Sequence, residues 1–81
     1  MIKVIEIEDS PSTGVRLGDV DEGTPIFAKK DGKLKGMVIH DRKRGWKLSL
    51  GGAFGATGYH GTRRECLISC LEYGYEFFVE E

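Results

Sequence analysis

The sequence predicts an α+β fold in which an antiparallel sheet of four to five strands carries one helix packed on a face, in the order β-β-β-β-α-β. Three features lead to this expectation: an Asp-Gly turn between two extended segments, alternating apolar residues at 46–50, and a capped helical segment beginning at Thr62. A length of 81 residues fits a single domain, 1–81. The apolar fraction of 40% suits a packed core rather than a disordered chain.

The N-terminal part carries the weaker structural signals. Residues 2–8 are rich in β-branched side chains and predict a strand. Residues 9–14, with the sequence DSPSTG, are typical of a loop. Residues 15–20 predict a short second strand, and a turn is expected at 21–23.

The clearest β signal is a hairpin around Asp31-Gly32, a dipeptide that favours a type I′ turn between strands 25–30 and 33–40. A regular ladder from this turn predicts the cross-strand pairs Lys30–Lys33, Lys29–Leu34, Ala28–Lys35, Phe27–Gly36 and Ile26–Met37. A second, basic turn at 41–45 then leads into 46–50, where every second residue is apolar, as in a half-buried strand. Together these segments predict an antiparallel meander.

Residues 51–61 contain five glycines, which makes a regular helix or strand there unfavourable. The helix is expected to begin after Thr62, which forms a capping box with Glu65, and to stop at Gly74. Its predicted buried stripe consists of Cys66, Leu67, Cys70, Leu71 and Tyr73. Residues 75–79 have apolar side chains on both faces and predict a strand inside the sheet.

Charge is divided by segment, although the net charge is only −1. Residues 1–28 and 48–81 are acidic, whereas 29–47 carry eight basic against two acidic residues. The candidate basic patch comprises Lys29, Lys30, Lys33, Lys35, Arg42, Lys43, Arg44 and Lys47. Such a patch is typical of nucleic-acid binding, and Trp46, Phe54 and Tyr59 would serve as stacking platforms if they are exposed. The pI of about 6.1 argues against that function, and solvated loop charges are the alternative.

A second candidate site lies where the glycine-rich segment enters the helix. Glycines allow close approach of a ligand, and a helix N-terminus offers unpaired N–H groups to an anion. The candidate ligand-binding residues are Gly55, Gly58, Tyr59, His60, Gly61, Thr62, Arg63 and Arg64. The segment has neither a Walker A ending nor a Rossmann context, so a connector without a ligand is the alternative interpretation.

The cysteines and histidines give no catalytic or metal motif. Cys66 and Cys70 are four residues apart on the predicted helix, a spacing too wide for a disulfide, so we expect reduced core thiols. The alternatives are a nucleophilic Cys66–His60 pair and a metal site formed by Cys66 and Cys70 with His60 or His40. We expect neither an enzyme, nor a metal, nor a cofactor.

The sequence therefore predicts a small binding module, inhibitor or adaptor in the cytoplasm, without a membrane segment. Its expected partner is an acidic protein surface or a small anionic ligand. Nucleic acid bound through 29–47 and a phage-type accessory role with a purely protein partner are the alternatives. Homodimerisation would cover the second face of the sheet.

Overall fold

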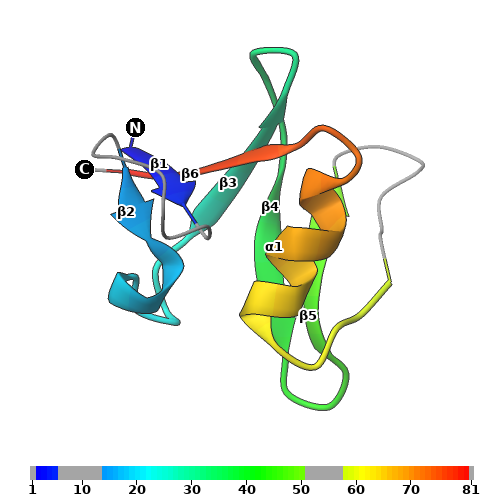
Figure 1. The fold of residues 1–81 in the computed structure, drawn as a ribbon. Coiled ribbons are helices and arrows are strands. Elements are labelled where there is room, and N and C mark those ends of the chain that lie inside the picture. Colours follow the sequence, from blue (N-terminus) through cyan, green and yellow to red (C-terminus); the bar gives the residue numbers. More distant parts are fainter. Residues whose placement is uncertain (1, 6–13, 51–57, 81) are drawn as a thin grey trace.

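A computed structural model describes residues 2–5, 14–50 and 58–80. These residues form an α+β fold in which one helix lies across a six-stranded sheet of order β2-β1-β6-β3-β4-β5 (Figure 1). In chain order, the elements are β1 (Ile2–Ile5), β2 (Val15–Arg16), the 3₁₀ turn η1 (Leu17–Asp19), β3 (Ile26–Lys30), β4 (Lys33–Asp41), β5 (Gly45–Leu50), α1 (Arg63–Leu71) and β6 (Glu76–Val79). The predicted α+β class with one helix is confirmed, but the sheet has six strands rather than the four to five expected.

The sheet is mixed, so the prediction of a wholly antiparallel sheet is wrong at one edge. There β2 runs parallel to β1, with Val15 opposite Val4. The predicted 15–20 strand ends after two residues because the chain turns into η1, which buries Leu17 against the core. A parallel neighbour depends on where the chain returns to the sheet, and the local residue pattern does not encode this.

The Asp-Gly turn forms as predicted, with φ of 54° at Asp31 and 76° at Gly32. The turn end of the ladder also has the predicted partners, Lys30–Lys33 and Lys29–Leu34. Beyond it, a register shift between Ala28 and Lys29 replaces the other predicted pairs by Ala28–Gly36, Phe27–Met37 and Ile26–Val38.

The register shift is a β-bulge, and it has a physical reason. A regular ladder would place Lys35 opposite Ala28, whose side chain is fully buried. The bulge leaves Lys35 without a partner on β3 and puts Gly36 opposite Ala28 instead. Gly36 also allows β5 to approach, because a Cβ there would lie 2.0 Å from the carbonyl oxygen of Ser49. The bulge thus keeps a lysine out of the core.

The core lies between α1 and the sheet. The helix contributes Cys66, Leu67 and Cys70, which pack with residues such as Leu48 and Phe77. The sheet order places β6 between β1 and β3, which confirms an interior strand.

The predicted burial of Leu71 and Tyr73 is wrong, since they are 39% and 66% exposed. At about 100° per residue, Leu71 lies roughly 90° round the helix from the buried stripe, and Tyr73 follows the last helical residue.

The predicted signals are present at both helix ends, although α1 itself ends at Leu71, before the expected stop at Gly74. The Glu65 N–H donates to Thr62 Oγ1 over 3.1 Å, which is one half of the expected capping box. At the other end Gly74 has φ of 88°. The Gly74 N–H donates to the Leu71 carbonyl and the Tyr75 N–H to the Cys70 carbonyl, the two bonds of a Schellman motif. Among the described residues, no helix has the length and apolar character needed to cross a membrane.

Candidate functional site

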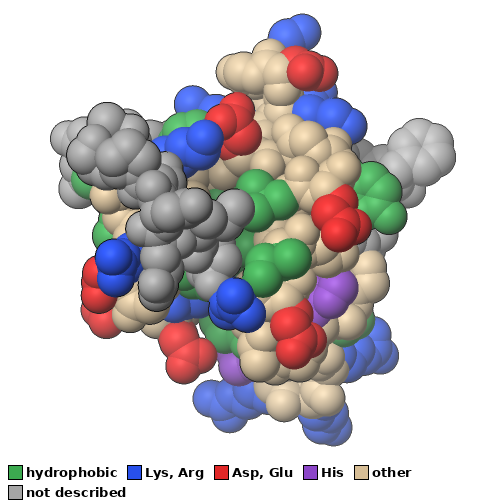
Figure 2. Space-filling model, viewed as in Figure 1, with side chains coloured by type: hydrophobic (Ala, Val, Ile, Leu, Met, Phe, Trp, Pro, Cys, Tyr) green, Lys and Arg blue, Asp and Glu red, His purple; other side chains and the backbone are tan. Residues whose placement is uncertain are grey.

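The basic segment 29–47 does not form one patch. Its two turns lie at opposite ends of β4, a strand of nine residues, which separates them by about 27 Å at 3.4 Å per residue. Figure 2 shows basic side chains at both of these ends of the molecule. Lys29, Lys30, Lys33 and Lys35 belong to the β3–β4 end, and Arg42, Lys43, Arg44 and Lys47 to the β4–β5 end.

The two lysines of β3, at the β3–β4 end, make cation–π contacts with aromatic residues near the C-terminus. The Lys29 ammonium lies 4.9 Å from the ring centroid of Phe78, and that of Lys30 lies 5.3 Å from Tyr75. Glu76 is the cross-strand partner of Lys29 and also forms a salt bridge of 2.8 Å with Lys3. Acidic and aromatic groups of the C-terminal segment 75–78 therefore lie beside these lysines.

The basic turn at the second end is held by Asp41. Its Oδ1 accepts hydrogen bonds from the N–H groups of Lys43, at 2.8 Å, and Arg44, at 3.1 Å. These two bonds to the carboxylate lower the pKa of Asp41. Gly45 then closes the turn with φ of 102°. The acidic residue of this turn thus fixes its backbone, while Arg42, Lys43 and Arg44 stay exposed.

The segment after the glycine-rich stretch pairs with the start of β5. Trp46 and His60 exchange two backbone hydrogen bonds, of 2.8 and 2.7 Å. Gly45 makes this approach feasible, because a Cβ there would lie 2.2 Å from the His60 carbonyl oxygen. Directly paired residues share a face of a sheet and successive residues alternate. His60 therefore lies with Trp46 on the helix side, and Tyr59 lies on the opposite face.

On that opposite face, Tyr59 meets two cations from the basic end. The Lys47 ammonium lies 4.9 Å and the Arg44 guanidinium 5.7 Å from the Tyr59 ring centroid. We call Arg44, Lys47 and Tyr59 the Tyr59 cluster. Arg44 and Lys47 come from the predicted basic patch, and Tyr59 comes from the predicted ligand-binding segment.

Arg63, a predicted anion ligand, is directed inward. Its guanidinium donates hydrogen bonds to the carbonyl oxygens of Leu17 and Asp21, both at 3.0 Å, and of Val20. It also lies 5.7 Å from the Trp46 ring. The structure thus uses this arginine to join the start of α1 to the η1 segment.

The other predicted site residues are dispersed. Gly58, Gly61, Thr62 and Arg64 are exposed around the entry to α1, whereas Gly55 and the predicted stacking residue Phe54 lie outside the described residues. Trp46 is 7% exposed, and the ring of His40 stacks on it at 4.2 Å. The condition for Trp46 to act as a stacking platform, an exposed ring, is therefore not met.

The two cysteines are free thiols, as expected, and both are buried. A hydrogen bond with Cys70 and burial raise the pKa of the Cys66 thiol far above its usual range. A neutral buried thiol is a poor nucleophile. Within the described part of the chain, no group of three or more His, Cys, Asp or Glu side chains is placed to hold a metal ion.

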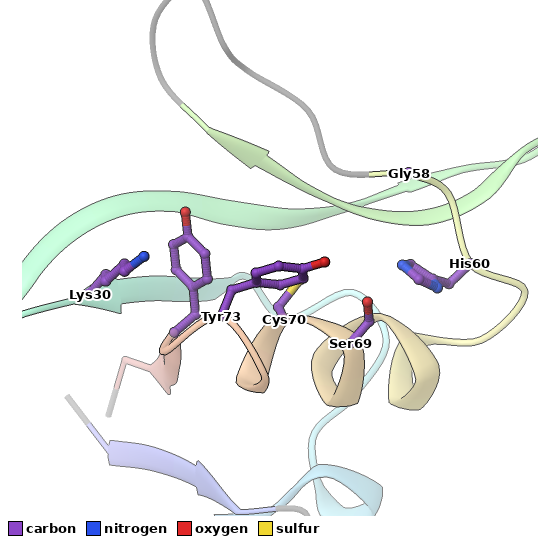
Figure 3. Close-up of a pocket in the computed structure, with 7 residues that line it drawn as sticks. Lys30, Gly58, His60, Ser69, Cys70 and Tyr73 are labelled. Carbon is purple, nitrogen blue, oxygen red and sulfur yellow. The ribbon is translucent and has the colours of Figure 1, made fainter.

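A cavity of about 410 Å³ lies on the helix side. Its lining residues are Lys30, Gly58, His60, Ser69, Cys70, Tyr73 and Tyr75 (Figure 3). Ser69, Tyr73 and Tyr75 line this cavity but were not among the site residues predicted from the sequence. The sequence feature that could have indicated a site here is the pair of tyrosines on either side of Gly74, where the helix was expected to stop.

Comparison of the chain with protein-family models, with curated proteins and with solved structures found no match.

Proposed function

We propose that this protein is a small non-enzymatic binding module that recognises an acidic protein surface through the Tyr59 cluster and the adjoining basic turn. The observation that carries the proposal is the placement of the Arg44 and Lys47 cations around one half-buried tyrosine ring, on the sheet face opposite α1.

Positioned cations favour binding of an anionic partner. The face of a tyrosine ring attracts a cation by about 0.5–1 kcal/mol at an exposed site. This attraction limits the freedom of two long side chains before a partner arrives, so less entropy is lost on binding. The Asp41 carboxylate, which accepts from the N–H groups of Lys43 and Arg44, stays ionised and offsets part of this positive charge.

An extended acidic surface fits this arrangement better than a small phosphate. The cluster projects from a sheet face rather than closing around a ligand, and Arg42 and Lys43 continue the positive charge along the turn. Arg63 gives its donors to backbone carbonyls, which removes one cation that a phosphate cradle at the helix start would need. A small phosphorylated ligand and nucleic acid remain as outcomes of the test.

The test is fluorescence anisotropy with a labelled oligoglutamate peptide. Arg44→Gln/Lys47→Gln is expected to weaken binding about tenfold, since two ion pairs of up to about 1 kcal/mol each are lost. Lys33→Gln/Lys35→Gln removes the same charge from the other end of β4 and serves as the matched control, with little expected loss.

Equal losses in the two variants would overturn the proposal, because binding would then depend on net charge rather than on the cluster. Binding of inorganic pyrophosphate, measured by calorimetry, without binding of oligoglutamate would favour the small anionic ligand. Binding of a single-stranded oligonucleotide in its place, with an affinity that falls steeply with salt, would favour nucleic acid.

A further inference from the structure

The cavity between the second half of α1 and the end of β3 is a separate candidate site. Figure 3 shows Lys30 at one end and His60 at the other, with Ser69 and Cys70 of the helix between them. We infer that this cavity binds a small, flat aromatic anion such as an aryl carboxylate.

The size and walls of the cavity suit such a molecule. Its volume of about 410 Å³ falls in the range of about 300–1,000 Å³ typical of small-molecule sites. Cys70, which is 1% exposed, borders it from the core side. Tyr73 and Tyr75 supply aromatic rings, and Tyr75 is anchored because it packs against the core. A planar apolar body can stack on such rings.

The polar groups of the cavity favour a negative charge on the ligand. None of the described residues that line it carries a carboxylate. Lys30 contributes an ammonium group, which the Tyr75 ring holds 5.3 Å from its centroid. His60 and the Ser69 hydroxyl can donate further hydrogen bonds.

The nearby end of α1 opposes an anion less than a bare helix C-terminus would. The Cys70 carbonyl accepts from the N–H groups of Tyr73 and Tyr75, and the Leu71 carbonyl accepts from Gly74. The negative partial charge of these two carbonyls is therefore partly compensated.

The inference is independent of the proposed function. Tyr59 and His60 are consecutive residues of an extended segment, so their side chains lie on opposite faces of the sheet. A ligand in the cavity and a partner at the Tyr59 cluster contact different side chains. Arg44→Gln/Lys47→Gln should therefore leave aryl carboxylate binding intact.

The experiment is an NMR titration of the ¹⁵N-labelled protein with 2-naphthoate. Two matched probes are 2-naphthamide, which keeps the rings without the charge, and acetate, which keeps the charge without the rings. We expect saturable shifts of the Gly58, Ser69 and Tyr75 amides with naphthoate, weaker shifts with naphthamide, and none with acetate. Equal affinity for naphthoate and naphthamide, or no saturable shift, would overturn the inference.

Variants of Lys30 and Tyr73 locate the ligand. Lys30→Met should weaken naphthoate binding about fivefold, as expected for loss of one partly exposed ion pair, whereas Lys30→Arg should retain it. Lys33→Met, on the exposed turn, is the control. Tyr73→Ala removes a wall residue that is 66% exposed, so it tests the site without endangering the fold. Unchanged affinity in both Lys30→Met and Tyr73→Ala would rule out this cavity.

Discussion

Arg63 and Trp46 lie in contact, with the guanidinium carbon 5.7 Å from the indole ring centroid. The same guanidinium donates to three backbone carbonyls of the 17–21 segment, more than 40 residues earlier in the chain. One side chain thus connects the first turn of α1, the start of β5 and the segment that follows β2. This arrangement makes Arg63 a stabilising residue and leaves the recognition of anions to other cations.

Replacing Arg63 should destabilise the fold. Arg63→Ala removes a charged donor from three carbonyl oxygens, two of them in part-buried hydrogen bonds. The Leu17 and Asp21 carbonyls still accept from the Val20 and Thr24 N–H groups, whereas the Val20 carbonyl loses its charged donor. We expect the free energy of unfolding to fall by about 2–3 kcal/mol, measured by urea denaturation. Arg63→Lys should recover only a fraction, because an ammonium group lacks the planar fork of donors. The control, Arg42→Ala, lies in the exposed turn and should change stability by less than about 0.5 kcal/mol. Equal effects at the two positions would contradict this role.

Gly45 is expected to tolerate no side chain. Its φ of 102° is unfavourable for other residues, and a Cβ would lie 2.2 Å from the His60 carbonyl oxygen. Gly45→Ala should therefore cost at least about 1–3 kcal/mol in the free energy of unfolding and separate the 58–60 segment from β5. Gly61→Ala is the matched control, since its Cβ would meet nothing within 4 Å. Similar unfolding curves for both variants would show that the Trp46–His60 pairing does not form as described.

The buried thiol of Cys66 predicts a loss of stability at alkaline pH. A hydrogen bond with Cys70 and burial raise its pKa in the folded state above the ordinary value of 9.0. Below pH 9 the thiol is protonated in both states, and its stabilising contribution is complete. Above pH 9 the unfolded chain releases a proton that the folded chain retains, so the free energy of unfolding falls as pH rises.

Urea denaturation of wild type and Cys66→Ala at several pH values isolates this effect from the titration of lysines and tyrosines. The stability difference between them should be constant below about pH 8 and shrink at higher pH. Rapid alkylation of Cys66 by iodoacetamide in the native protein would contradict its buried, protonated state.

Local structure could be predicted from the sequence wherever one or two residues determine the backbone. Asp31-Gly32 adopts the positive φ values that its turn requires, and Thr62 and Gly74 mark the helix ends. The β-bulge at Lys35 could not be predicted, because it depends on Ala28 being buried by elements distant in sequence. The parallel pairing of β2 with β1 has the same origin, since it is a property of the assembled sheet.

The candidate site was predictable only as a set of residue types. Arg44, Lys47 and Tyr59 were all candidates, but their convergence depends on the pairing of His60 with Trp46, for which the sequence carries no signal. The inward direction of Arg63 was missed because its acceptors are backbone carbonyls, which have no residue signature. The predicted basic patch also combined the cations of the β3–β4 end with those of the β4–β5 end, which lie at opposite ends of β4.

The most direct test of the Tyr59 cluster is to map where an acidic partner binds. Oligoglutamate is titrated into the ¹⁵N-labelled protein at low salt, and amide shifts are followed residue by residue. We expect saturable shifts at Arg44, Lys47 and Tyr59, with the β3–β4 turn unaffected, and their loss in Arg44→Gln/Lys47→Gln. Shifts centred on Lys33 and Lys35, or distributed over all exposed lysines, would contradict it.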